Sequence, residues 1–260
     1  MRVTFIGLIC AVLLLCCDVA QAHFGMVIPS SSTIMESEQG NMSAIIAFSH
    51  PFSARGMNME KPEQVFLEGP GGRENLTDSL EAVHFMDGEA WQAKFRLSKP
   101  GVWQLAAIPK PYYEKSEDNY IIHYTKTVIG AFGVEDGWNK MLGLPMEIMP
   151  LVRPFANYAG NLFGATVFKN GKPLPNAIVE VEFLNASGLV SAPNPYYETQ
   201  VLRTDQNGNF YFSVPWAGWW GFAALAEDTA GNLAKEGKQV ETGAVIWLEF
   251  VEPQIKGLAK

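Results

Sequence analysis

Four histidines are the residues of this chain best suited to chemistry, because imidazole nitrogens bind transition metals. In the stretch AQAHFGMVIPS, residues 20–30, His23 directly follows Ala20-Gln21-Ala22, whose small residues are typical of a signal-peptidase site. If cleavage follows Ala22, His23 offers a free α-amine and an imidazole that can close one chelate ring on a metal. An α-amine has an ordinary pKa of about 7.7–8.0, so a metal displaces its proton near neutral pH.

The other three histidines are the natural partners of His23, because no cysteine would remain in the cleaved chain. His50, in FSHPF, lies at a predicted strand end, where the following proline stops the strand and could direct the ring towards a rim. His123, in YIIHYTK, lies inside an alternating strand and is either a ligand or a satisfied interior histidine. His84, in EAVHFMDG, lies next to a turn and is the weakest candidate. For His50 the ordinary alternative is a capped or solvent-facing loop histidine.

Residues 1–22 have the pattern of a secretory signal peptide, with Arg2 ahead of an apolar run from Phe5 to Cys17. That run is shorter than the about 20 residues that a membrane-spanning helix needs. A lipoprotein signal is the main competitor, but leucines rather than small residues precede Cys16. All three cysteines lie in the signal, so the exported chain would have no disulfides, which favours a bacterial periplasm.

The net charge and the hydropathy of the chain limit the classes of partner that we expect. A net charge of −8 without a basic run argues against nucleic-acid binding. No later segment is long and apolar enough to cross a membrane, so we expect no direct membrane span and any membrane partner to be a separate protein.

Short apolar or alternating runs, separated by Gly, Pro and Asn, predict an all-β protein. We expect two immunoglobulin-like antiparallel β-sandwich domains in tandem, at residues 23–142 and 155–260. The proline-rich segment GLPMEIMPLVRP, residues 143–154, would link them in an extended, semi-rigid form. Strands of the first domain are predicted at Ser43–Ser49, Gln64–Leu67, Ala90–Leu97, Val102–Ile108 and Ile121–Phe132.

The second half resembles the transthyretin-like or carboxypeptidase-regulatory type of immunoglobulin-like module. The resemblance rests on GATVFKNGKPLPNAIVEVEFLN followed by TDQNGNFYF, in which Asp205–Gly208 predicts a tight turn. Modules of that type mostly bind or scaffold. Trp216, Trp219 and Trp220 in WAGWWGF could stack on a carbohydrate, but closely spaced glycines favour packing of these indoles in the core.

Oxygen and sulfur ligands are less specific than the histidines. Glu114, Glu117 and Asp118 could bring negative charge to a cation, although such a run usually forms a solvated loop. Methionines such as Met26, Met57 and Met59 could bind soft metals, but methionine more often fills apolar gaps. The sequence has no P-loop, no G-x-S-x-G elbow and no H-E-x-x-H pair, so we expect no hydrolytic enzyme.

Several motifs together resemble a bacterial family of periplasmic proteins assigned to cobalt/nickel uptake systems of the energy-coupling-factor type. The motifs are HFGMVIPS, FSHPF, MNMEKP, PKPYYEKSEDNYIIHYTK, AFGVEDGW, GLPMEIMPLVRP and PWAGWWGFAAL. The resemblance covers nearly the whole mature chain and implies a domain of otherwise unknown function. It places His23, His50 and His123 within family motifs and His84 outside them. Some relatives end in a membrane segment, which FVEPQIKGLAK is not.

Three functions are compatible with these observations. The first is a periplasmic protein that captures Ni²⁺ or Co²⁺, or Cu²⁺, through His23, His50, His123 and His84 and delivers it to an uptake transporter. The second is a copper oxidase that uses an N-terminal histidine brace. The third is a non-metal binding or adhesive module for carbohydrate or protein, which the immunoglobulin-like second half and the tryptophans suggest.

Overall fold

Alternating apolar residues and frequent turn-forming residues fold this chain almost entirely into strands, as the sequence predicts. The computed structural model describes residues 22–227 and 234–255; most of the predicted signal peptide, residues 1–21, lies outside them. Within the described residues there is no α-helix, only three short 3-10 turns, η1 (Glu36–Glu38), η2 (Thr77–Ser79) and η3 (Pro195–Tyr197). In this part of the chain, no helix is long and apolar enough to cross a membrane.

The first sheet is antiparallel and has the order β1-β3-β8-β7, with β4 also paired to β3. Its strands come from the first half of the chain. Their bounds are β1 (Phe24–Pro29), β3 (Asn41–His50), β4 (Arg55–Met57), β7 (Glu81–Phe85) and β8 (Gly88–Arg96).

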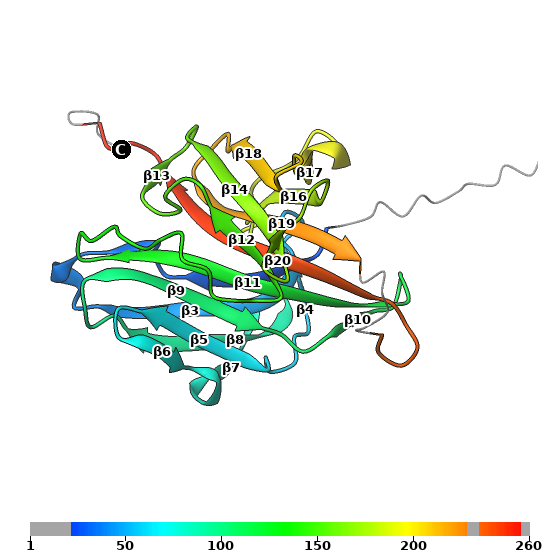
Figure 1. Cartoon of the computed structure of the whole chain (residues 1–260), viewed down its shortest axis with the longest axis horizontal. Helices are drawn as coiled ribbons and strands as arrows, with labels where there is room; N and C mark the ends of the chain where they lie inside the picture. Colours follow the sequence, from blue (N-terminus) through cyan, green and yellow to red (C-terminus); the bar gives the residue numbers. More distant parts are fainter. Residues whose placement is uncertain (1–21, 228–233, 256–260) are drawn as a thin grey trace, which may run out of the picture.

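The second sheet takes strands from both halves of the chain, in the order β17-β16-β19-β20-β11-β9-β5-β6. In Figure 1, β20 and β11 run side by side between the first-half strands below and the second-half strands above. The bounds are β2 (Thr33–Ile34), β5 (Gln64–Gly69), β6 (Gly72–Asn75), β9 (Gly101–Ile108), β10 (Tyr112–Glu114), β11 (Asn119–Ala131), β13 (Asn157–Tyr158), β16 (Ile178–Phe183), β17 (Gln200–Arg203), β19 (Gly218–Glu227) and β20 (Val240–Val251).

The third sheet covers the second-half strands with β12 (Met146–Pro150), β14 (Leu162–Lys169), β15 (Lys172–Pro173) and β18 (Asn209–Ser213). The five strands predicted in the first half are confirmed as β3, β5, β8, β9 and β11, each within two residues at either end. The predicted tight turn is present as well, because the Gly208 N–H donates to the Asp205 carbonyl and Gly208 has a positive φ of 79°. The prediction of an all-β sandwich protein is therefore confirmed.

The second sheet is not purely antiparallel, because the short strands β2 and β13 pair in parallel with β11 and β20, and these two long strands also pair in parallel with each other. β11 and β20 pair in parallel, from Tyr120↔Val240 to Thr127↔Trp247. Parallel neighbours need a long connection, and here the whole second half of the chain provides it. The boundary predicted at 143–154 stays a prediction, but strands from both sides of it share one sheet.

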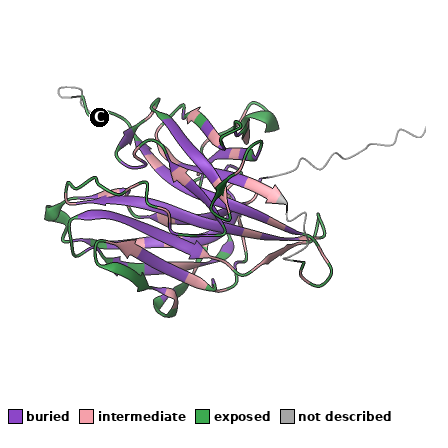
Figure 2. Cartoon of the chain, in the orientation of Figure 1, coloured by how far each residue is buried: buried purple, intermediate pink, exposed green. Residues whose placement is uncertain are grey.

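The halves also share one hydrophobic core. This core combines first-half side chains such as Phe66 and Val128 with second-half side chains such as Phe163, Phe222 and Ile246, all fully buried or nearly so. Figure 2 shows that buried residues follow the strands where the layers face each other, whereas exposed residues lie in loops and edges. Burial of apolar surface is the main stabilising term in folding, so the two halves stabilise each other.

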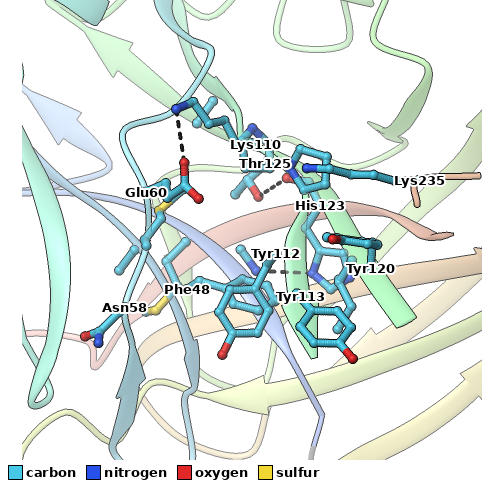
Figure 3. Close-up of a pocket in the computed structure, with 18 of the residues that line it drawn as sticks. Phe48, Asn58, Glu60, Lys110, Tyr112, Tyr113, Tyr120, His123, Thr125 and Lys235 are labelled. Carbon is cyan, nitrogen blue, oxygen red and sulfur yellow. Dashed lines mark hydrogen bonds and ion pairs between the residues drawn. The ribbon is translucent and has the colours of Figure 1, made fainter. Parts of the chain in front are cut away.

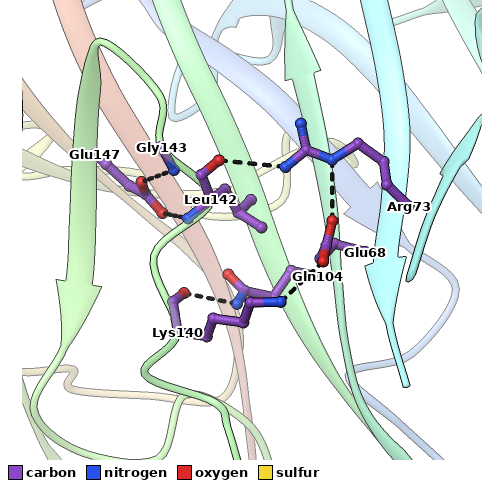
Figure 4. Close-up of polar contacts among 7 residues, drawn as sticks. All are labelled: Glu68, Arg73, Gln104, Lys140, Leu142, Gly143 and Glu147. Carbon is purple, nitrogen blue, oxygen red and sulfur yellow. Dashed lines mark hydrogen bonds and ion pairs between the residues drawn. The ribbon is translucent and has the colours of Figure 1, made fainter. Parts of the chain in front are cut away.

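A buried ion pair ties the proline-rich segment to the shared sheet. Glu147, on β12, receives N–H donors from Leu142 (2.8 Å), Gly143 (3.0 Å) and Leu144 (3.3 Å), as Figure 4 shows for the first two. The Lys126 ammonium, on β11, lies 2.7 Å from the same carboxylate. Both residues are about 1% exposed. Burial lowers the pKa of Lys126, and the neighbouring Glu147 charge opposes that shift.

Side chains of the first half also bind the backbone just before β12. Gln104 donates to the Lys140 carbonyl (2.8 Å) and Arg73 donates to the Leu142 carbonyl (3.2 Å), while Arg73 also pairs with Glu68. These contacts hold the segment before β12 against β9 and β6. The predicted extended linker is therefore an ordered part of the sandwich.

A second polar contact joins the halves at the loop after β3. Glu182, on β16, accepts the Phe52 N–H (3.0 Å) and the Thr199 hydroxyl. The Asn185 amide donates to the Phe52 carbonyl (2.9 Å). Burial raises the pKa of Glu182 to about 8, despite the opposing effect of these hydrogen bonds.

We expect Glu147→Ala to lower the free energy of unfolding by about 3–5 kcal/mol, because it leaves the Lys126 charge buried without a partner. Chemical denaturation followed by tryptophan fluorescence measures the change. Lys110→Ala is the control, since its pair with Glu60 is solvent-exposed and exposed pairs contribute about 0–1 kcal/mol. Equal losses in the two variants would contradict the assigned role of the buried pair.

Glu182 gives the fold a specific pH dependence. Its folded-state pKa of about 8 lies above the ordinary value of 4.5, so the folded state binds more protons between these values. The contribution of Glu182 to the free energy of unfolding therefore falls as the pH rises from about 5 to 8 and is constant above that range. Urea denaturation at pH 5, 7 and 9 should show a smaller fall for Glu182→Gln than for the wild type. The exposed Glu74→Gln is the control, and a pH-independent difference between Glu182→Gln and the wild type would refute the assignment.

Candidate functional site

The strand register brings two of the predicted site histidines together. β1 and β3 pair antiparallel with Phe24 opposite Ser49. His23 precedes Phe24 and His50 follows Ser49, so the two histidines face each other one position beyond that pair. Their ring centroids lie 4.6 Å apart. The structure therefore brings together two side chains that are separated by 27 positions in the sequence.

The position of His23 is held by the strand that it precedes. Phe24 and Met26 are buried on one face of β1, and Phe24 packs edge-on against Trp247 with centroids 5.8 Å apart. The Trp247 indole N–H donates to the Gly25 carbonyl at 2.8 Å. Because side chains alternate along a strand, His23 and Gly25 share the opposite face. There Phe48 stacks on the His23 ring at 5.8 Å.

Glu114 orients the His23 ring. Its Oε2 lies 3.1 Å from His23 Nε2, and its Oε1 accepts the backbone N–H (2.9 Å) and hydroxyl (2.6 Å) of Ser116. Burial alone would raise the pKa of Glu114, but the hydrogen bonds from Ser116 and the proximity of His23 lower it overall. An ionised carboxylate requires the proton of a neutral His23 ring on Nε2. The lone pair then lies on Nδ1, the nitrogen that can form a chelate ring with the residue's own α-amine.

His50 Nδ1 faces the bond at which the signal peptide is predicted to be cut. It donates to the Ala22 carbonyl at 2.8 Å, and that carbonyl belongs to the Ala22–His23 peptide. Ala22 and His50 are both buried, at 6% and 8% exposure. Cleavage there removes the acceptor of His50 Nδ1 and replaces it with the His23 α-amine.

The surroundings of the His23 and His50 imidazoles favour their neutral forms. Burial lowers the pKa of His23, and the nearby His123 lowers it further, against the opposing effect of Glu114. Burial also lowers the pKa of His50, against its hydrogen bond to the Ala22 carbonyl, and the neighbouring His23 adds to the effect. A neutral imidazole carries the free lone pair that a metal ligand needs.

His123 lies behind this pair and contacts protein groups on both sides. It is 1% exposed on β11, its Nδ1 accepts the Gly25 N–H at 3.2 Å, and its Nε2 lies 3.5 Å from a Glu241 oxygen. Nε2 is buried and has no hydrogen-bond partner among the described residues. Because Nδ1 accepts, the proton of the neutral ring lies on Nε2, towards Glu241. Burial opposes ionisation of Glu241, but the proximity of His123 lowers the pKa of Glu241 overall.

Glycines on two neighbouring strands make room for His123. A Cβ added at Gly243, its partner on β20, would lie 2.5 Å from the ring, and one at Gly25 would lie 2.9 Å from His123 Cβ. The His123 ring fills a space that any residue larger than glycine at position 25 or 243 would occupy. His123 is therefore an interior histidine, with one ring nitrogen bonded to the Gly25 N–H and the other without a hydrogen-bond partner among the described residues.

A cavity of about 350 Å³ lies beside His123 and Phe48. Figure 3 shows Tyr112, Tyr113 and Tyr120 around it, with Lys110 and Glu60 paired at 3.1 Å at one side. Phe48 contacts Tyr112 at 4.8 Å between centroids and His123 at 5.7 Å. Aromatic rings therefore separate the cavity from the His23–His50 pair.

The remaining predicted ligands lie elsewhere or serve other contacts. His84 is exposed on the edge strand β7, opposite Glu89. This strand is two places away from β3, which carries Phe48. Asp118 accepts the Tyr113 hydroxyl and pairs with Lys238 in an exposed loop. Met26 and Met59 are buried.

Sequence reasoning underestimated Glu114. It stands in an acidic run of the kind that usually forms a solvated loop, and Glu117 and Asp118 of that run are indeed exposed. The Glu114 side chain is only 13% exposed and bonds to His23. The alternating hairpin sequence around Tyr112 was the available signal, but its packing against β1 depends on tertiary structure.

Within the described residues, no group of three or more His, Cys, Asp and Glu side chains is arranged to hold a metal ion. The His23–His50 pair supplies two imidazoles. A third nitrogen at this place would be the α-amine that cleavage after Ala22 creates.

The chain matches one family, described as a domain of unknown function (DUF4198), over residues 20–228. No curated protein matches it. Among solved structures, the D0-D1 domain of intimin shares 13% identity over 88% of this chain and 100% of that one, with a TM-score of 0.26. A putative carbohydrate binding protein from Bacteroides uniformis shares 10% identity over 75% of this chain and 91% of that one, with a TM-score of 0.24. At such scores these similarities support no functional inference.

The slot around His123 leads to a stability prediction. Gly243→Ala should lower the free energy of unfolding by about 1–3 kcal/mol, because the new methyl group overlaps the buried ring. Thermal unfolding measures the change. Gly71→Ala is the control, since a Cβ there would meet only the Lys99 ammonium, at 3.7 Å. An unchanged midpoint for Gly243→Ala would show that His123 is not held as described.

Proposed function

This chain belongs to the family of the DUF4198 domain, whose function is unknown, and we propose that its mature form binds a divalent transition metal at the N-terminus. The observation that carries the proposal is the hydrogen bond of 2.8 Å from His50 Nδ1 to the Ala22 carbonyl. It puts a second imidazole beside the nitrogen that cleavage would free. His23 then supplies its amine and Nδ1, and His50 supplies Nδ1.

The residues present fit such a metal in three respects. The two rings lie 4.6 Å apart between centroids, burial lowers both histidine pKa values, and Glu114 fixes the His23 tautomer. A carboxylate that holds the second nitrogen of a ligating imidazole is the usual outer-shell arrangement. Of the four predicted ligands, the proposal keeps His23 and His50. It gives His123 the role of a packing and positioning residue and gives His84 none.

The donor set also bears on the metal. Nitrogen donors bind Co²⁺, Ni²⁺ and Cu²⁺ with affinity increasing in that order, so Cu²⁺ should bind most tightly in isolation. The proposal retains capture of Ni²⁺ or Co²⁺ for delivery to an uptake transporter, which the resemblance to uptake components supports. It also retains a periplasmic location, which the predicted signal peptide supports. Availability of the metal would then decide which ion is carried.

The test uses mature protein that begins at His23, verified by mass, titrated with Cu²⁺, Ni²⁺ and Co²⁺ by calorimetry. We expect one metal per chain. A form with the His23 α-amine acetylated, and His50→Ala, should each lose more affinity than the about 10–100-fold that loss of an outer-shell partner costs. Glu114→Gln should fall within that range. His84→Ala is the matched control and should bind as the wild type does.

Equal affinity in the acetylated and free forms would overturn the proposal, because acetylation removes the amine donor. Oxygen uptake by the copper-loaded protein with a reductant separates the carrier from a copper oxidase. Uptake that requires His23 and His50 would favour the oxidase, whereas a carrier should show none above the protein-free copper control.

A further inference from the structure

A second cavity, of about 580 Å³, lies between the loop that follows β3 and the second-half strands β18 and β19. Its apolar walls come from segments far apart in the sequence: Phe52, Val190, Pro193, Tyr197, Phe212 and Trp216. The volume lies within the roughly 300–1,000 Å³ typical of small-ligand sites. The cavity therefore has the size of a binding site for a small molecule or a few sugar units.

Trp216 is held rigidly while its side chain remains accessible. Its ring packs edge-on against Phe183 at 5.6 Å and tilts against Trp220 at 5.0 Å, and the Trp220 indole N–H donates to the Trp216 carbonyl at 3.0 Å. Both indoles line the cavity, but Trp220 is only 3% exposed and belongs to the core, whereas Trp216 is 37% exposed. The WAGWWGF motif therefore combines both roles that the sequence suggested.

Tyr197 provides a second aromatic surface, with 56% exposure at the end of η3. Phe52, which also lines the cavity, is held through its backbone by contacts from Glu182 and Asn185. Rigid aromatic side chains bind ligands with little loss of conformational entropy. Both rings are therefore suited to stacking against a flat apolar surface of a ligand.

The polar groups of the cavity indicate the charge of that ligand. Ser191, Glu198, Gln200 and Ser213 contribute hydroxyl, carboxylate and amide groups, and among the described residues the lining contains no Lys, Arg or His. An anionic ligand would find no counter-charge here and would meet the Glu198 carboxylate. Sugar rings present apolar C–H faces bordered by hydroxyl groups, which match aromatic surfaces beside neutral and acidic hydrogen-bonding groups.

We propose that this cavity binds a neutral saccharide, which stacks on Trp216 and Tyr197 and donates hydroxyl hydrogen bonds to Glu198 and Gln200. The site is separate from the N-terminal histidines and requires no metal. It gives the protein a second binding activity, towards an uncharged glycan.

The test uses the whole mature protein in EDTA, with cellohexaose, maltohexaose, mannohexaose and chitohexaose as probes, followed by tryptophan fluorescence and calorimetry. At least one should bind, and Trp216→Ala and Tyr197→Ala should each weaken that binding by at least about tenfold, as expected for a central aromatic contact. Tyr158→Ala removes an equally exposed tyrosine outside the cavity and should leave binding unchanged. Circular dichroism confirms that each variant is folded, and Tyr197→Ala keeps the test valid if Trp216→Ala unfolds.

Three results would overturn the proposal. One is the absence of binding to every saccharide of the panel at millimolar concentration. Another is binding that neither aromatic variant weakens. The third is tight binding of a polyproline peptide that Trp216→Ala abolishes while no saccharide competes, which would assign the cavity to a peptide ligand.

Discussion

The parallel pairing of β11 with β20 is the interaction on which the rest of this structure depends. It joins the two halves of the chain in one sheet, and it brings the last strand of the described chain back beside β11, near the end of the first half. Trp247, on β20, thereby reaches β1, where its indole donates to Gly25 and its ring packs on Phe24. These contacts add to the antiparallel pairing of β1 with β3, which sets the residue that follows the predicted cleavage site beside His50.

The same pairing explains the glycines and the buried charges near it. Gly243 lies opposite His123 in the ladder, and the absence of a side chain there is what allows the imidazole to be buried. Further along β11, Lys126 reaches Glu147, whose carboxylate also collects the backbone N–H groups of the preceding turn. Buried charges are tolerated because each is paired and hydrogen-bonded.

The two proposed binding sites are joined by a short segment at the end of β3. His50 belongs to the N-terminal pair, the Pro51 carbonyl accepts the Asn185 N–H at 3.1 Å, and Phe52 lines the second cavity. Contacts from Glu182 and Asn185 therefore position the segment that carries both. The second cavity combines Phe52 of the first half with lining residues of the second half, whereas His23, His50 and Glu114 all belong to the first half.

The sequence by itself determined the strands, the turns and the candidate ligands. Alternation and turn residues locate β3, β5, β8, β9 and β11, because the period of a strand is a local property of the chain. The small residues before His23 made it the leading candidate ligand, and the scarcity of histidine made His50, His123 and His84 its candidate partners.

Only the tertiary structure decided which of these residues meet. Antiparallel register sets His23 opposite His50, glycine packing encloses His123, and an edge position leaves His84 exposed. The role of Glu114 and the division of the WAGWWGF motif into a buried Trp220 and an accessible Trp216 were decided in the same way. These outcomes depend on pairing between segments far apart in the chain, which periodicity and composition do not encode.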